Sequence, residues 1–404
     1  MEAAYKGILT IFLGVGGCLL YYYLSNQFLD KVLYPAKGEK AGQNINRANM
    51  IRPWLFILPA MLALGLYLAY PVVATLWYSL TDRNQGGAFI GLANYQQMMN
   101  EPKFWEAMRN NMLWLIIVPA ASTAFGLLAA QLTDRIKWGS VAKSLIFMPM
   151  AISFVGAAVI FKLIYDTRPV DQAQIGVLNA VWLQFEGGIG SWLILRLLPA
   201  LLMLCGAAIS IYAAYGVFSA IREKGGAVLR SIAVIFLAFI GYSFLSLAAG
   251  AFTAVHEYGV PQNWLTIPGW NSFLLMVVLI WIQTGFAMVI LSAALRGIPE
   301  ETVEASIVDG ANPFQVFFKI KIPQISGTIV VVWTTITLVV LKVFDVVFAM
   351  TNGQWETQVL ANYMFDKLFR ANDWGVGSAS AMVIMLLVSP ILIWNVYNAR
   401  KEMK

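Results

Sequence analysis

The sequence is poor in the side chains that enzymes use for chemistry. It has one histidine, His256, and two cysteines, Cys18 and Cys205, among 404 residues. Both cysteines lie inside apolar segments, a position typical of small buried side chains and not of a disulfide or metal pair. The sequence also has no glycine-rich phosphate loop, no cluster of metal ligands and no nucleophile beside a base. We therefore expect no catalytic residue, no metal site and no cofactor on this chain.

Charged residues are scarce as well. Asp, Glu, Lys and Arg make up 12% of the chain and hydrophobic residues 59%, whereas a soluble domain has about 25% and roughly 45–50%. Uninterrupted apolar stretches of about 20 residues, enough to cross a bilayer, recur along the chain. The net charge of +6 is spread over short loops, which argues against a nucleic-acid partner. The predicted fold class is an all-α polytopic membrane protein in contact with lipid.

The apolar stretches predict about nine transmembrane helices. They are 7–26, 54–80, 112–133, 144–165, 192–219, 230–252, 271–295, 324–350 and 378–398. The loops on one side of these spans, together with Arg230 at a span edge, hold 17 of the 27 Lys and Arg residues. By the positive-inside rule that side is the cytoplasm. The N-terminus is then outside and the C-terminus in the cytoplasm.

Two segments leave alternatives open. The first span follows Lys6 and contains small residues at 14–18, as a signal peptide does, but the apolar run continues into three tyrosines that suit the membrane interface. The outer loops 81–111 and 351–377 are rich in aromatic residues. Such residues anchor short helices at the headgroup level, or they form a docking surface for an external partner.

The cytoplasmic loop 296–323 has the pattern of two short helices. Pro299, Glu300 and Glu301 are typical of a helix start, which predicts a helix to about Val308. Gly310 predicts its end, because glycine tolerates positive φ, and Pro313 starts a second helix. A helix pair lying on the lipid surface is the alternative, but it does not explain the spacing of the small and acidic residues.

This loop resembles the EAA loop of ATP-binding cassette (ABC) importer permeases. That pattern is Glu-Ala-Ala, two residues, Asp-Gly-Ala, five residues, Phe, two residues, Ile, two residues, Pro. Eight residues fall in register: Glu304, Ala305, Asp309, Gly310, Ala311, Phe317, Ile320 and Pro323. Ser306 is a mild departure. Segments 89–95, 281–286 and 342–345 are also similar to the MalF-like sugar permeases, and the likeness is nearest to permeases for α-glucosides and glucosylglycerol.

The resemblance implies a type I ABC importer permease core in residues 54–404, after an N-terminal helix and cytoplasmic linker in 1–53. Within the core, 192–252 is an extra helical hairpin and 296–323 the coupling loop. The implied partners are a second permease subunit, a dimer of ATPase subunits that binds ATP and magnesium, and an external solute-binding protein. The implied location is the bacterial cytoplasmic (inner) membrane, and the implied cargo a carbohydrate such as sucrose, trehalose, maltose or glucosylglycerol. The implied ATPase-coupling residues are Glu304, Ala305, Ser306, Asp309, Gly310, Ala311 and Pro323.

The substrate pathway is expected near the middle of the membrane, in the spans that flank the coupling loop. The candidates are Trp281, Gln283, Thr284, Met288, Trp333, Thr335, Ile336, Val340, Lys342 and Asp345. The alternative for the polar ones is hydrogen bonding between helices. By register, Ile336, Val339 and Val340 correspond to sugar-lining positions of maltose-type relatives, and their apolar character is a departure. Lys342 and Asp345, three residues apart, are expected to pair on one helix face, as a structural pair or as a gate.

Other functions compete with sugar import. The cargo could instead be another sugar, a polyol or a glycerol phosphate. A proton-coupled secondary transporter, with Asp345 as the proton carrier, explains the spans and the buried carboxylate but not the EAA loop. Dependence of uptake on a separate ATPase distinguishes the two classes.

Overall fold

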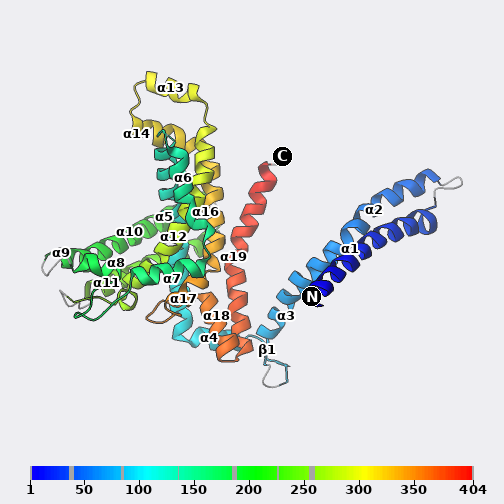
Figure 1. The fold of residues 1–404 in the computed structure, drawn as a ribbon, viewed down its shortest axis with the longest axis horizontal. Helices are drawn as coiled ribbons and strands as arrows, with labels where there is room; N and C mark the ends of the chain where they lie inside the picture. The colour runs from blue at the N-terminus through cyan, green and yellow to red at the C-terminus, as the bar shows by residue number, and fades with distance from the viewer. Residues whose placement is uncertain are drawn as a thin grey trace. The chain divides into compact units, whose positions relative to one another are not determined.

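The computed structural model describes residues 2–35, 41–82, 86–134, 136–183, 189–224, 227–253 and 260–402; His256 lies outside them. These residues are mostly helical, as predicted, and strands β1 (Thr81–Asp82) and β2 (Ala88–Phe89) form a small antiparallel ribbon (Figure 1). The chain divides into two compact units, Met1–Trp77 and Tyr78–Lys404.

The first unit is a helical hairpin. Helix α1 (Glu2–Phe28) continues into the π-helical turn η1 (Leu29–Leu33), and α2 (Ala41–Leu64) continues through η2 (Gly65–Ala69) into α3 (Tyr70–Ser79). The Tyr21 hydroxyl donates to the Leu55 carbonyl at 2.9 Å, and Arg52 pairs with Asp30 at 2.7 Å. The later residue of the first arm, Asp30, contacts the earlier residue of the second arm, Arg52, so the two arms are antiparallel.

The core of the second unit is built around α12 (Trp270–Arg296), which packs against α5 (Pro102–Thr133), α6 (Gly139–Phe147) and α16 (Ser326–Leu341). Two glycines allow the backbones to approach closely. A Cβ on Gly126 of α5 would lie 2.5 Å from the Ala287 Cβ, and one on Gly285 of α12 would lie 2.6 Å from the Ile146 carbonyl oxygen. The backbone of α12 therefore lies in close contact with α5 at Gly126 and with α6 at Gly285.

Two predicted spans are bent. Between α6 and α7 (Phe154–Ile164), after the 3-10 turn η4 (Met148–Ala151), the chain turns by 103°. The segment of α14 (Pro313–Gln315), η7 (Val316–Lys321) and α15 (Ile322–Gln324) meets α16 at 71°. In addition, α16 ends at Leu341 and a new helix, α17 (Asp345–Met350), begins after a break. The spans predicted over 144–165 and 324–350 are therefore not single unbroken helices.

The predicted count of nine spans is not confirmed by helix length and composition in the described part of the chain. Among the described residues, six helices are long and apolar enough to cross a membrane, or eight if each bent pair is one span. The last predicted span, 378–398, falls within α19 (Trp374–Glu402), whose apolar part Trp374–Pro390 is shorter than that criterion.

The extra hairpin of the second unit is helical, as predicted. Helix α9 (Ile189–Trp192), turn η5 (Leu193–Leu197) and α10 (Leu198–Lys224) form one arm, and α11 (Ala227–Thr253) the other. A Cβ on Gly206 would lie 2.8 Å from the Phe244 ring, so the arms are in close contact. Beside them, α8 (Val177–Trp182) and the turn η6 (Trp264–Thr266) meet through Trp182 and Trp264.

Short helices occupy one end of the second unit. They are α4 (Ala93–Asn100), α18 (Leu360–Phe365) and the π-helical turn η8 (Asp366–Arg370). Figure 1 places α4 and α18 at the end opposite α13 (Glu300–Val308), which lies in the loop between α12 and α16. Short helices were expected in the two outer loops, and the structure has them there.

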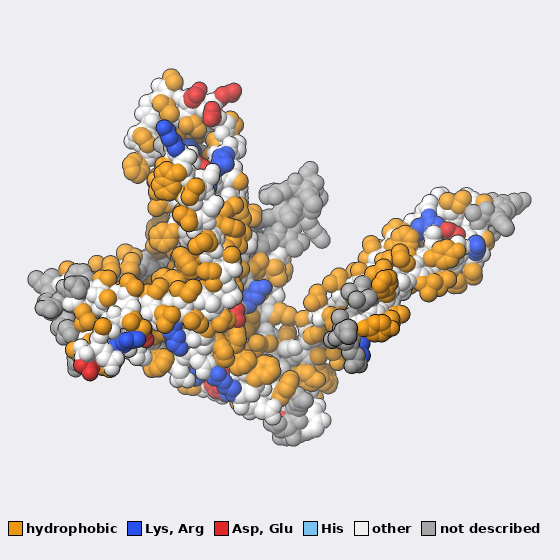
Figure 2. Space-filling model, in the orientation of Figure 1, with side chains coloured by type: hydrophobic (Ala, Val, Ile, Leu, Met, Phe, Trp, Pro, Cys, Tyr) orange, Lys and Arg blue, Asp and Glu red, His pale blue; other side chains and the backbone are white. Residues whose placement is uncertain are grey.

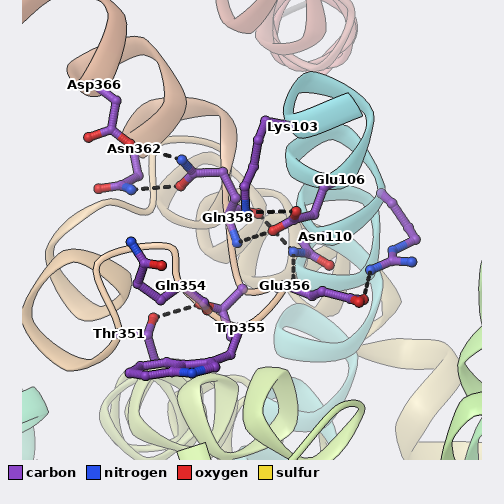
Figure 3. Close-up of polar contacts among 12 residues, drawn as sticks. Lys103, Glu106, Asn110, Thr351, Gln354, Trp355, Glu356, Gln358, Asn362 and Asp366 are labelled. Atoms are coloured by element: carbon purple, nitrogen blue, oxygen red, sulfur yellow. Dashed lines mark hydrogen bonds and ion pairs between the residues drawn. The ribbon is translucent and has the colours of Figure 1, made fainter. Parts of the chain in front are cut away.

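The loop between α17 and α18, which Figure 3 shows with its polar contacts to α5, has an unusual backbone. Asn352, Trp355 and Glu356 adopt φ of 54°, 54° and 62°, and Gly353 adopts 71°. The left-handed conformation costs a residue with a Cβ roughly 1–2 kcal/mol. The loop therefore depends on contacts from elsewhere to keep this shape.

Those contacts come mainly from the N-terminal half of α5. The buried Asn110 amide donates to the carbonyls of Glu356 and Gln358, both at 2.8 Å. The Glu106 carboxylate accepts from the Gln358 backbone N–H at 3.2 Å, and the Asn111 side chain accepts from the Leu360 N–H at 2.7 Å. The loop is thus fixed to α5, more than 240 residues earlier in the chain.

Replacement of Gly126 by alanine tests the close contact of α5 with α12. The added methyl group overlaps Ala287, and overpacking of this kind destabilises by about 1–3 kcal/mol. We expect a lower melting temperature of the purified protein in detergent. The matched control is Gly216→Ala in α10, where a Cβ meets nothing within 4 Å and where alanine should leave the melting temperature unchanged or raise it. Equal behaviour of the two variants would contradict the packing described.

Replacement of Asn110 by alanine tests the anchoring of the loop between α17 and α18. The change removes two hydrogen bonds, each contributing about 0.5–1.5 kcal/mol, from a loop with strained backbone. We expect faster amide hydrogen exchange at 352–358, measured by mass spectrometry. Gln97→Ala serves as the control, because that exposed side chain makes one 3.3 Å bond, to Asp373. Unchanged exchange in Asn110→Ala would show that the loop holds its shape alone.

Candidate functional site

Helix α13 begins and ends where the sequence predicts. Pro299 stands immediately before it, and Glu300 and Glu301 occupy its first turn, where acidic side chains complement the positive end of the helix dipole. Glu304 and Ala305 are exposed on its surface. The helix therefore presents an acidic, small-residue face to its surroundings.

The Asp309-Gly310-Ala311 sequence ends α13 in a Schellman motif. The Gly310 N–H donates to the Ile307 carbonyl and the Ala311 N–H to the Ser306 carbonyl, both at 3.0 Å. Gly310 has φ of 84°, and a Cβ there would meet nothing within 4 Å. The position thus requires glycine for its backbone conformation and not for lack of space.

Ser306, the departure from the EAA pattern, does not add a free polar group to the surface. It is buried, and its hydroxyl donates to the Val303 carbonyl within the same helix at 2.7 Å. The side chain therefore fills the place of a small apolar residue.

The second helical segment starts with a cap that the sequence interpretation missed. Asn312 and Gln315 form a capping box: the Asn312 side chain accepts from the Gln315 N–H at 2.8 Å, and the Gln315 side chain accepts from the Asn312 N–H at 2.9 Å. The Asn-Pro-Phe-Gln sequence carries this signal, since Asn followed three residues later by Gln is a known helix start. Pro323 lies in the first turn of α15.

Apolar side chains are exposed around α13. Val308 is 86% exposed and Phe314 77%, and Ile307 and Phe318 are also exposed. Figure 2 shows hydrophobic and acidic side chains together at this end of the unit. We call the four residues Ile307, Val308, Phe314 and Phe318 the apolar tip. Exposed apolar surface of this kind is typical of a protein interface.

The predicted pathway residues have different surroundings in the structure. Gln283, Met288, Ile336 and Val340 are buried inside this chain. The Thr284 and Thr335 hydroxyls donate to carbonyls one turn earlier in their own helices, at 2.7 and 2.8 Å. Trp281 packs edge-on against Phe161, with 5.4 Å between ring centroids, and Trp333 is 38% exposed.

Lys342 and Asp345 do not pair, contrary to the prediction. Helix α16 ends before Lys342, which has φ of −111°, and Phe344 has φ of −138°. The two residues therefore do not share a helix face, and no ion pair joins them in the described part of the chain. A hydropathy profile does not reveal this break, because most residues around it are apolar. The two charged residues in an apolar segment were the available signal of a break.

The break after α16 meets the bend between η4 and α7. Lys342, Phe344 and Asp345 line a small recess together with Phe154 and Val339. Asp345 also borders a wider hollow of about 380 Å³, lined by Met150, Ile152, Ser153, Phe154 and Val155. Ser153 caps α7 by accepting from the Gly156 N–H at 3.1 Å. We call the two depressions together the break-point recess.

Irregular backbone at membrane depth is expected only where protein or a water-filled cavity surrounds it, and broken helices commonly form transport sites. The recess is therefore a candidate part of a pathway. Met150, Ser153 and Phe154 were missed in the sequence, where Pro149 inside an apolar span was the available signal. Among the described residues, no group of His, Cys, Asp or Glu could hold a metal ion.

Comparisons with known proteins bear on the family of this chain. The family described as "Binding-protein-dependent transport system inner membrane component" matches residues 206–402. The chain is 50% identical to the alpha-glucoside transport system permease protein AglF of Rhizobium meliloti (strain 1021), over all of this chain and 99% of that protein. It is 34% identical to the osmoprotective compounds uptake permease protein GgtC of Synechocystis, over 87% of this chain and 99% of that protein.

The fold has a counterpart among solved structures. A crystal structure of a bacterial ABC transporter that imports the acidic polysaccharide alginate aligns with a TM-score of 0.59 at 16% identity, covering 91% of this chain and all of that one. From the full-length identity to AglF, the family match and the shared fold, the chain belongs to the binding-protein-dependent transport system inner membrane components and is a permease subunit of an ABC importer.

Proposed function

We propose that this permease imports an α-glucoside and is driven by a separate ATPase dimer that binds α13. The observation that carries the cargo is the 50% identity, over the full length, to a protein named as an alpha-glucoside permease. Similarity to the osmoprotective compounds permease supports a second candidate, an osmoprotectant such as glucosylglycerol. ATP and magnesium belong to the ATPase subunits in this proposal.

The exposed surface of α13 supports the coupling role. A protein partner covers the apolar tip, and Glu304 pairs with a basic or polar group of that partner. The Schellman turn at Gly310 sets the angle between α13 and the segment that leads to α16. Pro299 fixes where α13 begins and the turn at Gly310 fixes where it ends. We therefore expect the helix to move as a rigid piece when the partner moves.

The break-point recess supports a place for the sugar. Lys342 and Asp345 provide hydrogen-bond donors and acceptors for sugar hydroxyls, and Phe154 provides an aromatic face for a sugar ring. A second permease subunit closes the pathway from the other side. The buried candidates Gln283, Met288, Ile336 and Val340 support the walls of the pathway from within this chain.

The opposite end of the unit supports docking of an external solute-binding protein. Trp355 is 50% exposed in the loop fixed to α5, and the neighbouring Glu356 is exposed as well. A loop held rigid before binding loses little conformational entropy on binding. In this proposal α13 and the C-terminus lie in the cytoplasm and the N-terminus outside, as the distribution of Lys and Arg residues predicts.

The test is the ATPase activity of the assembled complex in lipid vesicles, with its binding protein, across α-glucosides, polyols and glycerol phosphate. We expect stimulation by an α-glucoside and uptake that requires ATP. Stimulation by a polyol alone would reassign the cargo. Uptake that follows a proton gradient without an ATPase would refute the importer mechanism for this chain.

Gly310→Ala tests the coupling turn. The methyl group fits sterically, but positive φ costs alanine about 1–2 kcal/mol, so the turn and the angle of α13 should change. We expect fewer sugar molecules imported per ATP hydrolysed, measured in the same vesicles. The control is Gly327→Ala, because Gly327 has ordinary φ and also has nothing within 4 Å. Equal coupling ratios in the two variants would remove Gly310 from the mechanism.

A further inference from the structure

We propose that Asp134, at the C-terminal end of α5, is a positioning residue that makes the coupling loop move together with α5 and α6. The inference rests on the proposed coupling role of α13. It concerns a cluster of four residues, Asp134, Lys143, Ser292 and Arg296, which we call the Asp134 cluster. None of these residues belongs to the EAA pattern.

Asp134 joins three helices through one carboxylate. It directly follows α5 and accepts from the Arg296 guanidinium, with Nε at 3.1 Å and Nη2 at 3.0 Å from Oδ1. Ser292 of α12 donates its hydroxyl to Asp134 Oδ1 at 3.0 Å. Lys143 of α6 donates to Asp134 Oδ1 and, at 2.6 Å, to the Ser292 hydroxyl. The cluster thus ties α5, α6 and the last two turns of α12 together.

The centre of the cluster is shielded from water more than an ordinary surface ion pair, whereas the Arg296 side chain at its edge is 65% exposed. The side chains of Asp134 and Lys143 are only 19% and 14% exposed. Isolated surface pairs contribute about 0–1 kcal/mol, whereas a shielded network with mutual hydrogen bonds holds its geometry better. A carboxylate removed from this site would leave the Lys143 charge partly buried and unpaired, which is costly.

The other end of the coupling loop reaches the same turn of α5. Lys321, the last residue of η7, donates to the Gln131 side-chain oxygen at 3.4 Å. Gln131 lies three residues before Asp134, and such positions are neighbours on a helix surface. The loop leaves the core after Arg296 and returns at Lys321, so both of its ends contact the final turn of α5.

The close contacts between helices deeper in the core transmit a movement of the coupling loop to the rest of the core. At Gly126 and Gly285 the backbone of α12 is too close to α5 and α6 to slide past either. A force on α13 therefore displaces α5, α6 and α12 together as long as the Asp134 cluster is intact. Since α6 leads through η4 to α7, the displacement reaches the bend that forms one side of the break-point recess.

Without Asp134, a force on α13 bends the chain between α12 and α13 and does not displace the core helices. Gly297 and Ile298 are the only residues between Arg296, at the end of α12, and Pro299, before α13. This short link becomes a hinge when Arg296 loses its partner. The variant therefore hydrolyses ATP with less displacement of the recess.

The cluster should be insensitive to pH near neutrality. Burial raises the pKa of Asp134, but hydrogen bonds from Lys143, Arg296 and Ser292 and the Lys143 charge outweigh it and hold the pKa below the ordinary 3.8. A lowered acid pKa gives stabilisation that is complete above the ordinary value and is lost only as pH falls through the lowered one. We therefore expect the ratio of variant to wild-type coupling to stay constant between about pH 5 and pH 8.

The experiment compares variants of the complete complex in vesicles that contain the external binding protein, with an α-glucoside as the probe. The variants are Asp134→Asn, Asp134→Glu and the double variant Asp134→Asn/Lys143→Met, which leaves no unpaired lysine. Asp171→Asn, in an exposed loop, is the matched control. Three quantities are measured: the amount of assembled complex, the sugar imported per ATP hydrolysed, and amide exchange at 297–298.

We expect Asp134→Asn and the double variant to import at least about fivefold less sugar per ATP hydrolysed. A factor of about five is the lower end of the range common for coupling between two sites. Exchange at 297–298 should rise in both, while Asp134→Glu and Asp171→Asn stay near the wild type. If the assembled Asp134→Asn and double-variant complexes keep the wild-type ratio, Asp134 supports assembly only and the inference is refuted. If the wild-type complex itself shows no ATP-driven uptake, the proposed function fails, and the inference fails with it.

Discussion

The close packing of α12 against α5 and α6 is the constraint on which the rest of the structure depends. At Gly126 and Gly285 the distance between helices is set by backbone atoms and not by flexible side chains. In a membrane, where lipid offers no hydrophobic drive to associate, such small-residue contacts are a main source of helix–helix affinity. They also leave α12 little freedom to move alone. The loop 296–323, the loop between α17 and α18 and the break-point recess are all attached to these helices.

This constraint gives α5 a role at both of its ends. Its first turns hold the strained loop at 351–358 through Asn110 and Glu106, and its last turn contacts both ends of the coupling loop through Gln131 and Asp134. The helix has 32 residues, which at about 1.5 Å per residue corresponds to roughly 48 Å. One helix thus connects the end proposed to receive substrate with the end proposed to bind the ATPase.

The sequence predicted local features well and distant contacts poorly. The bounds of α13 and the positive φ at Gly310 follow from Pro299, the first-turn glutamates and the Asp-Gly pair, because helix ends are determined by neighbouring residues. The breaks within two predicted spans were missed because hydropathy records how apolar a segment is and not whether it is straight. Pro149 and the charges at Lys342 and Asp345 marked the breaks. The partners of Asn110 in the loop 351–358, and Ser292 and Arg296 as partners of Asp134, could not be predicted, since they lie far along the chain.

The apolar tip has a consequence for the life of the subunit in the cell. Val308 is 86% and Phe314 77% exposed at the end proposed to lie in the cytoplasm, so under the proposed function a newly inserted chain holds them in water until the ATPase partner covers them. Uncovered surface of this kind is prone to aggregation and is subject to triage by chaperones and proteases. A permease synthesised in excess over its ATPase would therefore be removed. The stoichiometry of the importer would then be set by degradation of orphan subunits as much as by their rates of synthesis.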